Sequence, residues 1–171
     1  MTAQFLRSCF AITAIILVTS IAATAQDSLG RSTLRGLRGV KVSIDSFIPE
    51  TQEGLTLNQL QTDVELRLRK AGIRVLTDQE WLKTPGMPAL YVIVPTHKTD
   101  IGLYAVSIRV KFRQSVTLVR QPNSPSVLAG TYETNTYIGV IGTKRFRELR
   151  DRVADQVDIF INDYLAENPK H

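Results

Sequence analysis

Histidines, cysteines and paired acidic residues, which carry most catalysis and metal binding, are scarce in this sequence. Only two histidines occur, His97 and the terminal His171, so a Ser-His-Asp arrangement or a histidine metal site has little material. Asp45, Glu50 and Glu53 crowd the end of a predicted strand, and paired carboxylates can act as acid and base in glycoside hydrolysis. Nothing else in the sequence marks a sugar cleft. We therefore expect no catalytic residues, no metal and no cofactor.

One segment has the chemistry to bind an anion. Gly139 and Gly142 form a glycine-spaced turn, and Thr143, Lys144 and Arg145 follow where the last predicted helix begins. A helix amino terminus carries partial positive charge and free N–H groups, so cations placed there are unfavourable. An anion held by the backbone N–H groups, the hydroxyl and the basic side chains would relieve that conflict. The alternative is a flexible turn whose charges simply extend into water.

Residues 1–25 have the layout of a signal peptide. Arg7 gives the amino end a positive charge, residues 9–21 are mainly apolar, and Ala23 and Ala25 form a small-residue cleavage site. The apolar stretch is roughly 13 to 15 residues, whereas a membrane-spanning helix needs about 20, which argues against an uncleaved anchor. Cleavage after Ala25 predicts a periplasmic or secreted protein for which membrane association is not required.

Removal of the signal peptide also removes Cys9, the only cysteine. The mature chain can then hold no disulfide, thiolate nucleophile or zinc-thiolate site, so its stability must come from packing. The sequence has 21 Lys and Arg against 16 Asp and Glu, a net charge of +5, which the loss of Arg7 lowers to +4. Nucleic-acid binders usually cluster basic residues with stacking aromatics, so this mild excess predicts no nucleic-acid partner.

Periodicity divides the rest of the chain into strands and helices. Residues 26–38 are polar, basic and glycine-containing, and we expect a flexible basic arm there. From Tyr104 to Phe112 apolar residues alternate with polar ones, which predicts a strand with Val106, Ile108 and Val110 in the core and Arg109 and Lys111 exposed. The patterns as a whole predict strands over 40–44, 73–76, 89–94, 104–119 and 126–138, and helices over 56–71, 77–82 and 143–166.

These elements predict one α+β domain over 39–167, followed by a tail over 168–171. The order is β-α-β-(α)-β-β-β-α, with a mixed four- to five-stranded sheet. Because the two longer helices are amphipathic and the sheet has one apolar face, both helices should lie on that face. The expected architecture is a two-layer sandwich whose outer sheet face meets water.

The helix over 56–71, the strand over 104–112 and the closing helix over 146–165 together resemble a group of bacterial envelope accessory proteins. The resemblance is to their small α+β domains: the amino-terminal domain of TolB, the curli secretion protein CsgG and the penicillin-binding-protein activator LpoB. It is a pattern of elements over residues 39–166, with no shared motif. The resemblance implies binding to other envelope proteins and no enzymatic activity, hence an exported binding or assembly accessory protein. The alternative is a small-ligand-binding protein or a hydrolase with an unrecognised loop site.

Overall fold

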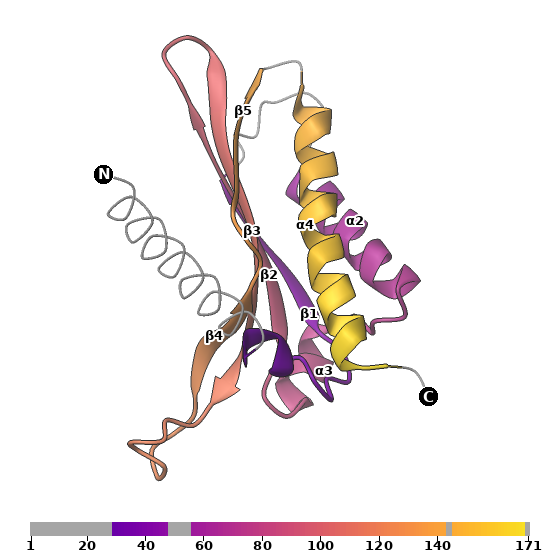
Figure 1. The fold of residues 1–171 in the computed structure, drawn as a ribbon, viewed down its shortest axis with the longest axis vertical. Coiled ribbons are helices and arrows are strands. Elements are labelled where there is room, and N and C mark those ends of the chain that lie inside the picture. Colours follow the sequence, from indigo (N-terminus) through magenta and orange to yellow (C-terminus); the bar gives the residue numbers. More distant parts are fainter. Residues whose placement is uncertain (1–28, 48–55, 143–144, 170–171) are drawn as a thin grey trace, which may run out of the picture.

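A computed structural model of the chain describes residues 29–47, 56–142 and 145–169 (Figure 1). The predicted signal peptide, Glu50, Glu53, Thr143, Lys144 and His171 lie outside the described residues. The elements in chain order are β1 Lys41–Phe47, α2 Leu57–Lys70, α3 Asp78–Lys83, β2 Ala89–Lys98, β3 Leu103–Val116, β4 Val127–Glu133, β5 Tyr137–Gly142 and α4 Phe146–Glu167.

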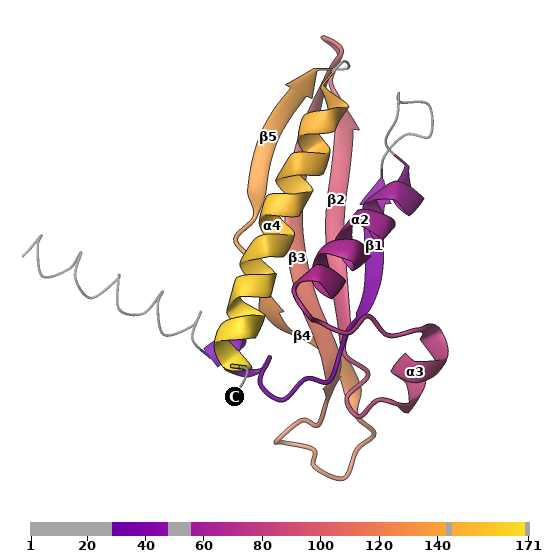
Figure 2. The same ribbon diagram turned by 90° about the vertical axis from the view of Figure 1, so that its right-hand side faces the viewer.

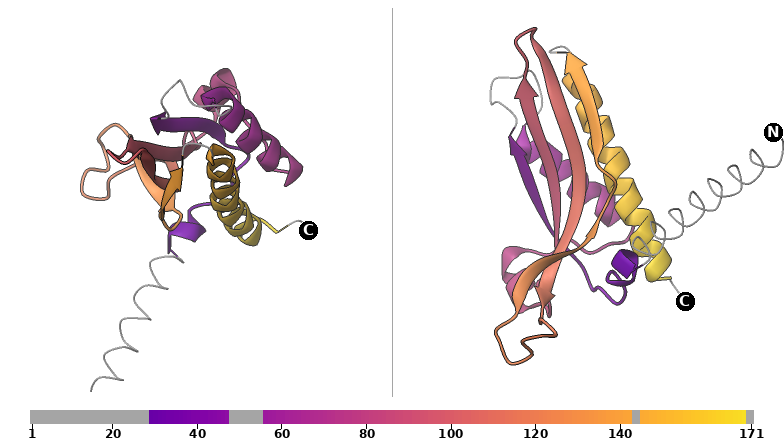
Figure 3. Two further views of the ribbon diagram at one scale, coloured as in Figure 1. Left: turned by 90° about the horizontal axis from the view of Figure 1, so that it is seen from above. Right: turned by 60° about the vertical axis from the view of Figure 1, so that its left-hand side comes forward.

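The strands form one five-stranded mixed sheet, as the predicted fold class requires. β1 pairs with β2 in parallel, and β2 pairs with β3 antiparallel. Both β4 and β5 pair antiparallel with the remaining edge of β3, one after the other along its length. The helices α2 and α4 lie together on one face of this sheet (Figures 2 and 3). The two-layer α+β prediction is therefore confirmed.

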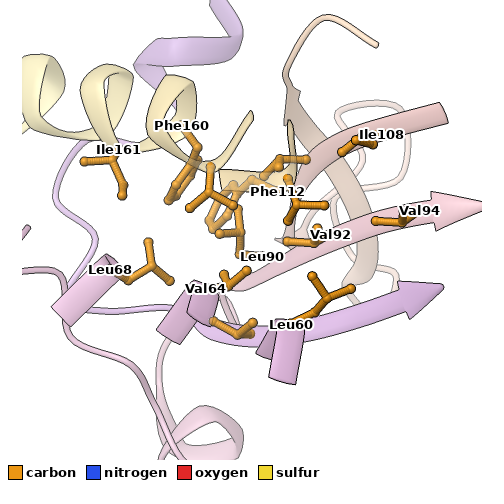
Figure 4. Close-up of a cluster of buried hydrophobic side chains, with 14 of the residues drawn as sticks. Leu60, Val64, Leu68, Leu90, Val92, Val94, Ile108, Phe112, Phe160 and Ile161 are labelled. Carbon is orange, nitrogen blue, oxygen red and sulfur yellow. The ribbon is translucent and has the colours of Figure 1, made fainter. Parts of the chain in front are cut away.

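The alternation along β3 decides which face of the sheet is buried. Val106, Ile108 and Val110 are buried, and Arg109 is exposed with Lys111 partly so, as the sequence predicts. Inward residues of β2 and β3 meet one apolar stripe from each long helix (Figure 4). The stripes consist of Leu60, Val64 and Leu68 on α2 and Leu149, Val153, Val157, Phe160 and Ile161 on α4.

Two helices begin with reciprocal side-chain caps. The hydroxyl of Thr56 accepts a hydrogen bond from the Gln59 N–H, and the Gln59 side chain accepts from the Thr56 N–H. Thr77 and Glu80 repeat the arrangement at the start of α3. In both capping boxes a hydroxyl and a long polar side chain three residues apart satisfy each other's backbone donors, which fixes where the helix begins.

Two strand predictions need correction. Residues 73–76 form no strand; they contribute a single parallel bridge, Val40 to Val75, beside the start of β1. The long strand predicted over 126–138 is interrupted between β4 and β5. There Thr134 turns inward, donating its N–H to the Val110 carbonyl and accepting the Val110 N–H on its hydroxyl. A side chain thus replaces one backbone group of the ladder, and β5 resumes farther along β3.

The strand predicted over 89–94 extends further in the structure, because β2 continues past Pro95 to Lys98. The β2–β3 pairing passes over residues 94 and 95 and resumes with Thr96 opposite Val106. Proline lacks the N–H that a ladder needs, so the strand keeps its extended backbone through a local gap in the pairing.

The described part of the predicted flexible arm is packed against the domain. Leu34 is fully buried in the core cluster. Near the end of α4, the Tyr164 hydroxyl donates to the Leu37 carbonyl at 2.9 Å, and the Asn168 side-chain amide donates to the Leu34 carbonyl at 2.9 Å. Leu37 also packs against the core, so two leucines and two backbone carbonyls hold a segment whose overall composition is polar.

Candidate functional site

The predicted anion-binding turn has a different local structure. Gly139 and Gly142 lie in strand β5 rather than in a turn. Arg145 is the first residue before α4, makes no side-chain cap to that helix, and pairs with Glu148 at 2.5 Å. Glu148 places a negative charge in the first helical turn, which offsets the unfavourable position of Arg145. Anion binding at this place stays a prediction. The ion pair with Glu148 already neutralises part of the positive charge that an anion would be needed to balance.

The few residues with catalytic potential are dispersed. His97 is exposed on β2, and Asp45 is exposed on the outward side of β1. Within the ranges that the structure describes, no three residues among the histidines, cysteines and acids stand close enough together to hold a metal ion. In the same ranges no helix is long and apolar enough to cross a membrane.

The outer face of the sheet divides into two halves along β3. We define the uncharged half-face by Pro95, Ala105, Ser107, Ile138 and Val140. Ala105 lies opposite Val140 and Ser107 lies opposite Ile138 in the β3–β5 register. Ile138 is 78% exposed and Val140 is 63% exposed. Large apolar side chains this open, side by side on a sheet, are typical of a protein-binding surface.

The other half of the outer face is charged, and its charges pair with one another. Lys111 and Arg109 both approach Glu133, at 3.3 Å and 3.8 Å. The Arg113 guanidinium lies over the Tyr91 ring, 5.0 Å from its centre. These cations outnumber the one acid among them, so this half carries net positive charge. We call it the cationic half-face.

The strands β1, β4 and β5 lie at the edges of the sheet, and they differ in how well they are protected against pairing with another strand. β1 carries Lys41, whose ammonium contacts Asp78 at 2.7 Å and lies 4.8 Å from the centre of the Trp81 ring. The side chain of Thr33, from the amino-terminal segment, lies against the β4 edge and contacts the Thr131 hydroxyl at 3.2 Å. Among the described residues, β5 has neither a charged side chain of its own nor a segment that covers its edge. Its sequence, YIGVIG, also contains no proline.

A hollow of about 1050 Å³ opens where β4 diverges from α4. The Tyr132 hydroxyl donates to Asp163 at 2.7 Å, and Arg31 approaches the same carboxylate at 3.6 Å. Its charged lining residues are Arg31, Lys111, Glu133 and Asp163. Arg31 pairs with Asp163 and Lys111 pairs with Glu133, so the hollow carries no net charge that would attract an ionic ligand.

A groove of about 520 Å³ separates the exposed sides of α2 and α4. Arg150 forms a two-pronged ion pair with Asp63, and Arg67 pairs with Asp158 at 2.9 Å. The hydrogen bond from Arg150 lowers the pKa of Asp63, and the same bond raises the pKa of Arg150. These cross-links hold the two helices together, which gives this groove a structural role.

No family model and no curated protein matches this chain. Among solved structures it is similar to a minor lipoprotein from Acinetobacter baumannii, with 16% sequence identity and a TM-score of 0.35. The match covers 76% of this chain and 95% of the lipoprotein. At this degree of similarity the match carries no information about function.

Proposed function

We propose that this protein is an exported, non-enzymatic accessory protein of the bacterial envelope that binds a partner protein through the outer face of its sheet. The observation that carries the proposal is the placement of both long helices on the opposite face, which leaves the uncharged half-face outside the helical layer (Figure 3). The exposed side chains of Ile138 and Val140 give that face an apolar centre, and the cationic half-face beside it would favour a partner with acidic residues at its rim.

Site-specific photo-cross-linking in the producing cells tests the proposal. A photoreactive residue at Ala105, which is exposed at the centre of the uncharged half-face, should give a reproducible cross-linked band containing one envelope protein. The same residue at Asn162, exposed on α4, is the matched control and should give none. Equal cross-linking from both positions, or none from Ala105 in any envelope fraction, would contradict the proposal.

The hollow beside β4 favours the alternative of small-ligand binding. Its volume of about 1050 Å³ is at the upper end of the range for ligand sites. Native mass spectrometry of protein purified from the envelope would reveal a retained small molecule. A bound mass that is lost in Tyr132→Phe protein, which lacks the hydroxyl donated to Asp163, would favour this second function.

A further inference from the structure

We propose that two copies of this chain pair through their β5 strands, so that two five-stranded sheets become one continuous sheet. An open strand edge offers unpaired N–H and C=O groups to any other strand, and natural proteins protect such edges with charges, prolines, bulges or covering segments. Among the described residues none supplies such a device to β5, whereas β1 carries Lys41 and β4 is covered by Thr33. β5 is therefore the strand edge in the described sheet that is ready for pairing.

The side-chain pattern of β5 selects an antiparallel register. Ile138 and Val140 point to the outer face, and Tyr137 and Ile141 point inward. Residues that lie directly opposite must point to the same face, so each outward residue has to meet an outward one. Pairing about Gly139 achieves this over the whole of 137–141: Ile138 of one copy lies opposite Val140 of the other, and Tyr137 lies opposite Ile141.

The partner is a second copy because β5 is complementary to itself in that register. No charge meets a like charge, and the four exposed apolar side chains of the two copies become cross-strand neighbours on one outer face. Each chain contributes one open edge, so the assembly closes as a two-fold dimer instead of growing into a filament.

The charge distribution of the outer face supports the same two-fold arrangement. The cationic half-face begins with Arg109, just past the Tyr137 end of β5, because Tyr137 lies opposite Ile108. A two-fold axis at Gly139 reverses the second copy. The two cationic half-faces then lie at opposite ends of the joined sheet, while the two uncharged half-faces meet at its centre. Association thus avoids the repulsion that side-by-side cationic surfaces would create.

Sedimentation velocity on protein purified from cells that produce the full chain measures the association. The wild type should sediment as a dimer at micromolar concentration. Ile138→Lys should sediment as a monomer, because two lysines would flank the axis at an uncovered edge. Val119→Lys is the matched control: Val119 is 97% exposed, lies away from β5, and its variant should stay dimeric. Circular dichroism of each variant checks that the domain is folded.

Cysteine cross-linking tests the register without disturbing the edge. In a Cys9→Ser background, Ile138→Cys/Val140→Cys places two cysteines of one copy opposite two of the other, at about 4.5 to 5.5 Å between Cα atoms. That separation suits a disulfide. Ile138→Cys alone leaves its two cysteines roughly 8 Å apart, too far for a ready disulfide. Oxidation should therefore give a covalent dimer from the double variant and little from the single one.

Several results would overturn the dimer. These are a wild type that is monomeric at every concentration, a dimer unaffected by Ile138→Lys, and equal cross-linking of the single and double cysteine variants. A monomer that sediments with phospholipid vesicles would assign the exposed apolar residues to a lipid surface instead. A monomer that still cross-links an envelope protein from Ala105 would refute the dimer and leave the proposed function standing.

Discussion

Neighbouring residues on β3 have opposite roles because their side chains point to opposite sides of the sheet. Ile108 is fully buried between the sheet and the helices, while Arg109, the next residue, lies on the outer face beside Glu133. A shift of one residue in the pairing would exchange the two faces and turn Arg109, Lys111 and Arg113 inward. The alternation therefore fixes both the core and the surface that is open to a partner.

The two β3 residues should differ sharply when each is shortened to alanine. Ile108→Ala should lower the free energy of unfolding by about 2 to 5 kcal/mol, since it removes a buried side chain and leaves a cavity. Arg109→Ala should lower it by less than about 0.5 kcal/mol, because its ion pair with Glu133 is long and exposed. Denaturant unfolding of both variants measures the difference. Equal losses would mean that the faces are assigned wrongly.

Glu80 should make stability depend on acid pH. Its carboxylate accepts from the Thr77 N–H and hydroxyl and from Arg74, and these bonds, the Thr77 N–H first, lower its pKa from 4.5 to about 2. The unfolded chain therefore takes up the proton more readily. The contribution of Glu80 is complete above the unfolded pKa and disappears as the pH falls through the folded one.

Glu80→Gln isolates this effect, because glutamine keeps a capping acceptor but has no charge to titrate. In urea unfolding over a pH series, the stability difference between wild type and variant should be constant above pH 4.5 and shrink between pH 4.5 and about 2. A difference that stays constant down to pH 2 would show that the carboxylate does not have the lowered pKa.

Sequence patterns correctly predicted those helices and strands that depend on residues near one another in the chain. The helix over 56–71 and the alternation of β3 depend on residues a few positions apart, and the structure has both. The break between β4 and β5 depends instead on Thr134 bonding to Val110, far away in sequence. No local pattern marks that hydrogen bond, so the sequence predicted one long strand and placed Gly139 in a turn.

The outer face of the sheet was predictable from the sequence, but the open edge of β5 was not. An outer sheet face open to water follows from two apolar helical stripes and one apolar sheet face, all visible in the sequence. The open β5 edge does not, because it depends on which strand ends at the side of the sheet and on whether other segments cover it. Thr33 covers β4 from the amino-terminal segment, which the polar composition predicted to be flexible.

Gly39, just before β1, packs closely against Arg74, which is distant in sequence. Substitution of Gly39 should show how much this close packing contributes to stability. A Cβ at Gly39 would lie 2.8 Å from the Arg74 carbonyl oxygen, beside the bridge between Val40 and Val75, and its φ is +155°. Gly39→Ala should therefore destabilise the fold by about 1 to 3 kcal/mol through backbone strain and displacement.

Gly102→Ala is the matched control for that substitution. Gly102 also has a positive φ, +77°, but among the described residues, apart from Gly102 itself and its two chain neighbours, no atom lies within 4 Å of the position that its Cβ would take. Thermal unfolding should show a smaller loss for Gly102→Ala than for Gly39→Ala. If the two losses were equal, backbone conformation alone would account for both, and the close packing of Gly39 on Arg74 would contribute nothing.

Residues 29–38, at the start of the described chain, are held against the end of α4. Leu34 enters the core, and Arg35 pairs with Glu167 at 2.8 Å. The Gly36 N–H donates to the Asn168 side chain at 2.7 Å. The packed domain thus begins close to the predicted cleavage point after Ala25, and a signal peptidase cutting there would leave these contacts intact.

Cleavage of the signal peptide can be tested directly. Protein recovered from the envelope fraction should begin at Gln26, because Ala23 and Ala25 are small enough for close approach by the peptidase and the preceding apolar run is too short to span a bilayer. Mass spectrometry of the amino-terminal peptide identifies the first residue. Ala25→Arg, which puts a large charged side chain at the cleavage point, should accumulate as the longer precursor. Wild-type protein that retains Met1, or that fractionates with the cytosol, would contradict export with cleavage.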